Sequence, residues 1–150
     1  MIGIVKKINL SVTRGRPRVK IDQGEFIKNE GLKGDSYFGS KVEVVMLPYA
    51  NRIEVDNSKE NGLCFERFLE TLSIDFNDFT PKIGDVLTIG TAEFKVASLG
   101  KRCFPECEIV QKRKTCALSR GTVYLDVIKS GVVSIGNRVI LKSRGLDDRS

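Results

Sequence analysis

Apolar and polar residues alternate over short stretches of this chain, which is the pattern of β-strands rather than of long helices. The alternation runs through residues 3–12, breaks at 13–17 and resumes over Val19–Ile21, which predicts a hairpin with a basic tip. Further strands are predicted where apolar runs are bounded by glycine or proline, at residues 42–47, 86–89, 92–96, 122–128, 132–133 and 138–142.

Two segments have helical character. Residues 48–55 predict a short helix, because proline is tolerated in a first turn, and residues 65–72 carry apolar side chains at helical spacing. Residues 75–82 predict a loop, and residues 30–35 predict a glycine-rich turn. Frequent strands without long helices between them indicate a mainly β domain, either a barrel or a sandwich.

The length of 150 residues suits one domain with a core of its own. We expect this domain to span residues 1–143 and a polar tail to follow at 144–150. No apolar run is long enough to cross a membrane, and the N-terminus leads directly into strand-like sequence. We therefore expect a cytoplasmic protein.

The composition restricts the chemistry that is available. The chain contains no histidine, which excludes Ser-His-Asp and Cys-His catalysis and histidine-containing metal sites. Any reaction must use thiols, carboxylates, amines, phenols or the backbone. The formal net charge of +6 favours anionic ligands through long-range attraction.

Three of the four cysteines lie in one segment, after the predicted strand at 92–96. Lys101 and Arg102 precede Cys103 directly, and neighbouring cations favour the thiolate, so Cys103 is the best candidate nucleophile. Cys107 and Cys116 are candidate resolving thiols.

Other interpretations of these cysteines remain open. Free cysteine is often a buried core residue, so each thiol can be purely structural. Alternatively, Cys107 and Cys116 can join Cys103 and Cys64 in a cysteine-only zinc or iron–sulfur site. Gaps of three and eight residues do not match the close cysteine pairs of standard zinc sites. A third reading is a redox-responsive binding module without catalysis.

The glycine-rich turn at 31–35, with Gly39 after it, has two interpretations. It can form a backbone nest for an anion, to which Lys33 or Lys41 adds charge, or it can be a tight turn that only connects strands. Arg14-Gly15-Arg16-Pro17-Arg18 resembles the core of an AT-hook, but a solvated hairpin tip is the favoured reading, so nucleic acid is the less favoured partner.

Four sets of residues in order along the chain carry a resemblance to a known family. They are Gly31-Leu32-Lys33-Gly34-Asp35 with Gly39, Ile74-Asp75 leading to Ile83-Gly84-Asp85 and Ile89-Gly90, Gly100-Lys101-Arg102-Cys103 with Cys107 and Cys116, and residues 131–136. Together they resemble the MOSC family, named for the C-terminal domain of molybdenum cofactor sulfurases, and in particular its small stand-alone bacterial members.

The resemblance implies a MOSC-like β-barrel with a few short peripheral helices, and a cleft that binds molybdenum cofactor or a related anionic ligand. Cys103 would carry a persulfide or contact molybdenum, while Cys107 could resolve the adduct. The anionic groups would be held by Lys33, Gly34, Asp35, Lys41, Lys101 and Arg102. The implied activity is sulfur transfer or molybdenum-cofactor-dependent reduction. The implied partners are a cysteine desulfurase or a maturation protein of molybdenum enzymes.

Overall fold

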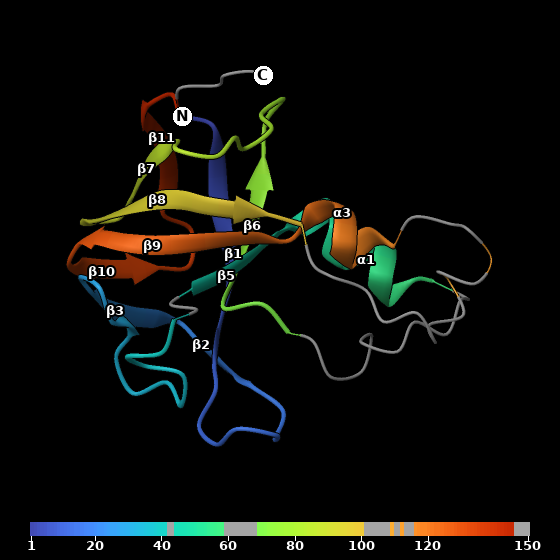
Figure 1. Cartoon of the computed structure of the whole chain (residues 1–150), viewed down its shortest axis with the longest axis horizontal. Helices are drawn as coiled ribbons and strands as arrows, with labels where there is room; N and C mark the ends of the chain where they lie inside the picture. The colour runs from blue at the N-terminus through green and yellow to red at the C-terminus, as the bar shows by residue number, and fades with distance from the viewer. Residues whose placement is uncertain (42–43, 59–68, 101–108, 110–111, 113–115, 146–150) are drawn as a thin grey trace.

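The structure is a computed structural model that describes residues 1–41, 44–58, 69–100, 109, 112 and 116–145 (Figure 1). Its strands are β1 (Gly3–Leu10), β2 (Val19–Ile21), β3 (Gln23–Ile27), β4 (Gly31–Leu32), β5 (Val44–Pro48), β6 (Leu72–Phe76), β7 (Val86–Ile89), β8 (Ala92–Leu99), β9 (Val123–Lys129), β10 (Gly131–Ser134) and β11 (Arg138–Ser143). Its described helices are α1 (Tyr49–Asp56) and α3 (Ala117–Gly121).

Seven strands close into a barrel. They follow the order β11-β7-β8-β9-β5-β6-β1, and pairing between β11 and β1 closes the ring. Neighbouring strands are antiparallel except for β5 and β6, which run parallel. β2 pairs with β1 outside the ring, and a smaller sheet has the order β10-β3-β4. The mainly β fold class predicted from the sequence is confirmed.

One apolar core fills the barrel, because alternate residues of each strand point inward. Its members include Val5 and Ile8 of β1, which are fully buried. Phe26 of β3 packs edge-on against Phe94 of β8, with ring centroids 5.2 Å apart. The smaller sheet therefore shares the core of the barrel.

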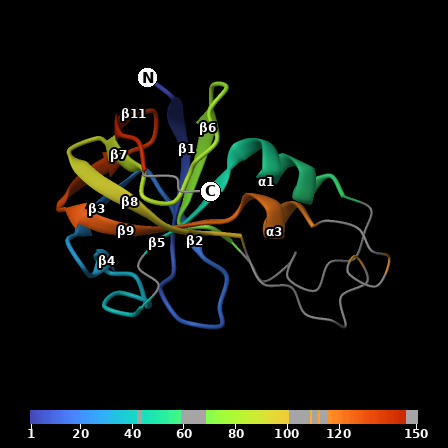
Figure 2. The ribbon, with the colours of Figure 1, turned by 45° about the horizontal axis from the view of Figure 1, so that its top comes forward.

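The two helices lie beside each other outside the barrel (Figure 2). Leu47, Val55, Ile109, Cys116, Ala117 and Leu118 form a second apolar cluster there. The helices approach so closely that a Cβ on Gly121 would lie 2.4 Å from Asn51 Nδ2. Only glycine fits at that position without displacing Asn51.

The elements predicted from periodicity agree with the structure in most places, but β3, β4 and α3 were not predicted, and two predicted segments differ. The helix predicted at 48–55 is α1, whereas the one predicted at 65–72 ends in a strand, since Leu72 begins β6. β6 also extends into the loop predicted at 75–82. The cause is tertiary: β6 lies between β1 and β5, and both supply its hydrogen-bonding partners. Residues 65–68 lie outside the described residues.

The packed body of the domain continues past Ser143, where the sequence suggested a boundary. Gly145 N–H donates to Asp85 Oδ1 at 2.7 Å, and the guanidinium of Arg144 lies 3.3 Å from Asp85 Oδ2. Arg144 also stacks over Phe79. None of the helices in the described part of the chain has the length and apolar character of a membrane span.

Candidate functional site

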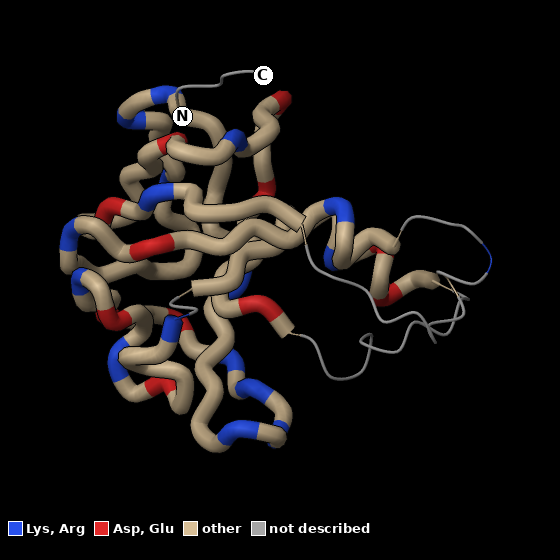
Figure 3. Tube along the Cα trace, viewed as in Figure 1, with Lys and Arg blue, Asp and Glu red and all other residues tan. Residues whose placement is uncertain are grey.

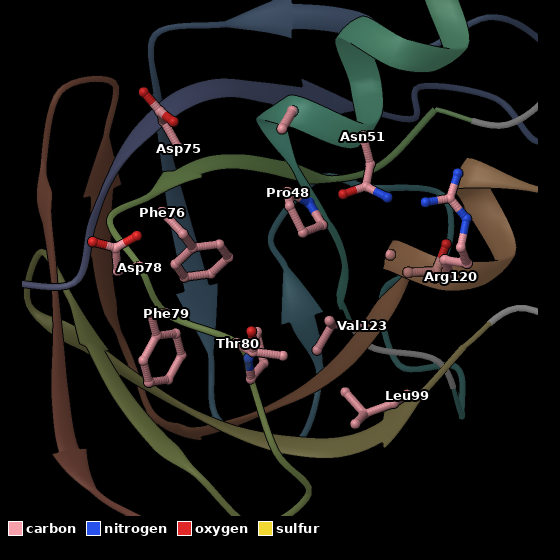
Figure 4. Close-up of a pocket in the computed structure, with 14 residues that line it drawn as sticks. Pro48, Asn51, Asp75, Phe76, Asp78, Phe79, Thr80, Leu99, Arg120 and Val123 are labelled. Carbon is pink, nitrogen blue, oxygen red and sulfur yellow. The ribbon is translucent and has the colours of Figure 1, made fainter.

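A pocket of about 500 Å³ opens at one end of the barrel (Figure 4). It lies where β5, β6 and β8 end and where β9 begins. Its wall consists of Pro48, Ala50, Asn51, Asp75, Phe76, Asp78, Phe79, Thr80, Pro81, Leu99, Arg120, Gly121, Thr122 and Val123. Sequence segments far apart in the chain therefore meet here, because strand ends of a barrel converge on one rim.

The fold fixes the wall at the end of β8. Leu99 is the last residue of β8 and pairs with Val123, the first residue of β9. Beyond this pair, Gly100 N–H donates to the carbonyl oxygen of Thr122 at 2.7 Å. The described chain on both sides of residues 101–115 is thus tied together at the pocket.

Two polar side chains form the helical side of the pocket. Asn51 Nδ2 donates to the carbonyl oxygen of Ala117 at 2.9 Å, which fixes the amide between α1 and α3. Figure 4 shows the amide oxygen of Asn51 turned away from α3. Arg120 is partly exposed, and its guanidinium lies 2.5 Å from Glu54 Oε2. Asn51 therefore offers an acceptor to a ligand, while the charge of Arg120 is partly offset.

The opposite side of the pocket is aromatic and acidic. The rings of Phe76 and Phe79 lie 5.5 Å apart at a tilt of 38°. Asp75 and Asp78 are exposed on the same side of the wall. The phosphate group of a pterin cofactor calls for cations or free N–H groups. The described wall has two exposed carboxylates and one paired guanidinium, so it does not fit such a phosphate.

The cysteines fall partly within the described structure. Cys103, Cys107 and Cys64 lie outside the described residues, as do Lys101 and Arg102. Cys116 is 8% exposed and precedes α3 in the second apolar cluster, beside Leu118. Its surroundings are those of a core thiol. Among the described residues, no group of three or more cysteines and carboxylates could hold a metal ion.

Asp35, a predicted ligand-binding residue, is occupied within the protein. Its carboxylate accepts the N–H groups of Ser11 and Tyr37 at 2.7 and 3.0 Å and lies 2.8 Å from Arg18 Nη1. With a side chain only 5% exposed, it anchors the loop to the β1–β2 hairpin. A carboxylate held in this way stabilises the turn rather than a bound anion.

The backbone of the same loop also bonds internally. Gly34 has a φ of +89°, yet a Cβ there would meet nothing within 4 Å, so glycine is needed for conformation and not for close approach. The neighbouring N–H groups of Lys33 and Asp35 donate to Glu25 and Leu32. These bonds favour the tight turn over the anion nest.

The structure does not bring Lys33 and Lys41 to the pocket. Lys33 is exposed and lies 3.7 Å from Glu25, and Lys41 is exposed just before β5. The pocket lies at the other end of β5, at Pro48. The four steps from Val44 to Pro48, at about 3.3 Å each, make this strand roughly 13 Å long. Lys41 and the pocket therefore lie at opposite ends of β5.

Apart from Asp75, which belongs to one of the motifs, sequence reasoning missed the residues that form the pocket. No motif marks Asn51 or Arg120, and Asn51 reaches a carbonyl that is 66 residues away in the chain. Gly121 is a further local signal, but glycine at a helix end is also typical of an ordinary cap.

Comparison with known proteins shows the fold. No family model and no curated protein sequence matches the chain. The YUAD protein from Bacillus subtilis has a TM-score of 0.67 at 13% identity over 93% of this chain and 94% of its own. YiiM from Escherichia coli has 0.66 at 20% identity over 98% and 72%, and YiiM from Geobacillus stearothermophilus has 0.55 at 17% identity over 97% and 75%. The chain therefore has the fold of the YiiM proteins and of the YUAD protein.

Proposed function

We propose that this chain is a member of the MOSC family that handles sulfur through Cys103. The fold it shares with YiiM, a MOSC-domain protein, supports the family. The order of its glycine, aspartate and cysteine motifs supports it independently of the fold.

One observation supports the proposal that this chemistry takes place near the pocket. Leu99 and Thr122 lie in the pocket wall, and the bond from Gly100 N–H to Thr122 ties them together. In the sequence, Cys103 follows Leu99 by four positions, with Lys101 and Arg102 in between. The segment that carries this thiol thus follows directly on a residue of the pocket wall, and a cavity of this size can hold a small substrate.

The proposed step is the acceptance of sulfur from a protein persulfide. The thiolate of Cys103 attacks the outer sulfur of the persulfide, a sulfur–sulfur bond forms on Cys103, and the donor's sulfur–sulfur bond breaks. The bonding pair leaves with the donor cysteine as a thiolate, so no oxidant or reductant is needed. A cysteine desulfurase supplies a persulfide of this kind, and Cys107 is the proposed resolving thiol.

Molybdenum cofactor is the ligand that the family resemblance suggests, and its binding is a separate proposal. The described pocket wall does not fit a phosphate group, so this proposal depends on Lys101 and Arg102, which precede Cys103. Lys33 and Lys41 contribute only if the ligand extends along β5. We derive no chemical step through the cofactor.

Intact mass spectrometry tests the sulfur step. Anaerobic protein mixed with a cysteine desulfurase and free cysteine should gain about 32 Da, one sulfur atom, as a persulfide. The gain should vanish in Cys103→Ser and persist in Cys116→Ala, the matched control whose thiol is buried. Equal gain in all three proteins would sink the assignment to Cys103.

Pterin fluorescence tests the cofactor proposal. Protein purified from cells that make molybdenum cofactor, then oxidised and denatured, should release a fluorescent pterin in stoichiometric amount. The double variant Lys101→Glu, Arg102→Glu should release much less. Absence of pterin from the unmodified protein would remove the cofactor and leave the sulfur step standing.

A further inference from the structure

We propose that the open edge of β2 and the basic hairpin next to it form a docking surface for an acidic, extended segment of a partner protein. The hairpin joins β1 to β2 and projects from the barrel (Figure 1). This surface is independent of the cysteine chemistry proposed above.

β2 has an unpaired edge. Its register with β1 pairs Ile8 with Ile21, Asn9 with Lys20 and Leu10 with Val19. Asn9 N–H donates instead to the carbonyl oxygen of Thr71 at 2.8 Å, so Asn9 and Lys20 form a non-hydrogen-bonded pair. The N–H and C=O of Lys20 consequently point away from β1, and no described residue bonds to them. An edge of this kind accepts an added strand.

The hairpin is held rigidly by the loop behind it. Arg18 forms the ion pair with Asp35, and Arg14 lies over the ring of Tyr37 at 4.5 Å while its Nε donates to the carbonyl oxygen of Ser36 at 3.1 Å. Ser36 N–H donates to Ser11 at 2.6 Å. A surface that is already ordered loses little entropy when a partner binds.

The charge of the surface has one sign. Residues 10–21 contain four cations and no carboxylate, and Figure 3 shows blue bands along the hairpin. Arg16 and Lys20 are exposed, and Val12 and Val19 of the same hairpin are 62% and 46% exposed. Cations alternating with exposed apolar side chains match a strand in which acidic and apolar residues alternate.

Two other occupants fit less well. An AT-hook needs its arginines free for the minor groove, whereas Arg14 and Arg18 are engaged with Tyr37 and Asp35. A second copy of this chain would bring Arg16 and Lys20 against the same cations, and like charges across a strand pair destabilise it. An acidic protein segment satisfies the charge and the free edge together.

Fluorescence anisotropy with synthetic peptides tests the proposal on the full chain. The probe is a labelled decapeptide of alternating valine and glutamate, and we expect it to bind. The same peptide N-methylated at two adjacent central residues, which blocks both of its edges, should bind at least about tenfold more weakly. A decapeptide of glutamate alone should also bind weakly, because it lacks the apolar contacts.

Protein variants locate the surface. Arg16→Glu should weaken binding of the alternating peptide about tenfold or more, whereas the matched charge reversal Lys129→Glu, on β9, should leave it unchanged. Lys20→Pro removes the free N–H of β2 at an edge position where proline is tolerated, and it should abolish binding while its melting temperature confirms folding. Equal affinity for the N-methylated peptide would overturn the proposal, as would tighter binding of an AT-rich duplex or concentration-dependent dimerisation lost in Arg16→Glu.

Discussion

Arg52 of α1 and Glu70, two residues before β6, form an ion pair that is closed to solvent. Arg52 Nη2 lies 2.6 Å from Glu70 Oε1, and the two side chains are 5% and 0% exposed. Asp56 lies 3.1 Å from Arg52 Nη1 at the surface. Asn9 Nδ2 donates to the carbonyl oxygen of Glu70, so the pair joins α1 to both β1 and β6.

Loss of one partner of this pair should be costly. Arg52→Met leaves the carboxylate of Glu70 buried without its guanidinium, and we expect the free energy of unfolding to fall by about 3–5 kcal/mol. Urea denaturation measures the change. The exposed pair of Arg120 with Glu54 is the control, for which Arg120→Met should cost less than about 1 kcal/mol.

The double variant Arg52→Met, Glu70→Leu should recover much of this loss, because no charge then remains buried. A double variant as unstable as Arg52→Met alone would mean that packing, and not the uncompensated charge, causes the loss. Burial lowers the pKa of Arg52, but the hydrogen bonds and charges of Glu70 and Asp56 outweigh it and raise that pKa above the usual value. Because folding raises this pKa, charged Arg52 stabilises the fold at every pH below the pKa that arginine has in the unfolded chain. Arg52 should therefore not titrate between pH 5 and 9.

Gly121→Ala should force the two helices apart. The added Cβ would meet Asn51 Nδ2 at 2.4 Å, so Asn51 must give up its bond to Ala117. We expect a loss of about 1–3 kcal/mol in the free energy of unfolding, as in other overpacked sites. In an Asn51→Ala background the same substitution should cost little, and a double-mutant cycle measures the difference. Additive effects would contradict the contact.

Asp35→Ala should loosen the hairpin. The variant leaves two N–H groups and the guanidinium of Arg18 without their shared acceptor, and charged hydrogen bonds of this kind contribute about 1.5–3 kcal/mol. Hydrogen exchange at the amides of Ser11 and Tyr37 should accelerate more than exchange in β8. If exchange rises equally in both places, the effect is global and the anchoring role is wrong. Asp35→Asn should be milder, because its amide oxygen still accepts.

The C-terminal anchor can be tested by truncation. A chain ending at Ser143 loses the bonds of Arg144 and Gly145 to the fully buried carboxylate of Asp85, and its melting temperature should drop. A chain ending at Gly145 keeps both bonds and should melt like the full chain. We expect a difference of about 1–3 kcal/mol between the two truncated proteins, the cost of an unsatisfied buried carboxylate. Identical melting would show that Asp85 is satisfied by Lys82 N–H alone.

The candidate site was only partly predictable. The cysteine segment stands out because cations precede a thiol directly, which is a local property of the chain. The pocket does not stand out, because its wall comes from strand ends that meet only in the closed barrel. The tight turn at 31–35 was one of two open readings, and the bonds of Asp35 and its neighbours favour it.

Most of the strands, the first hairpin and the short helix after β5 follow from the sequence by itself, because a period of two and a break at glycine or proline are local signals. The ring closure of β11 on β1 and the strand state of Leu72 come from tertiary structure, since the partners of a strand lie far away in the chain. The same holds for the ion pair of Arg52 with Glu70. A charged side chain needs a partner of opposite charge only where it is buried, and only the packed fold determines which side chains are buried.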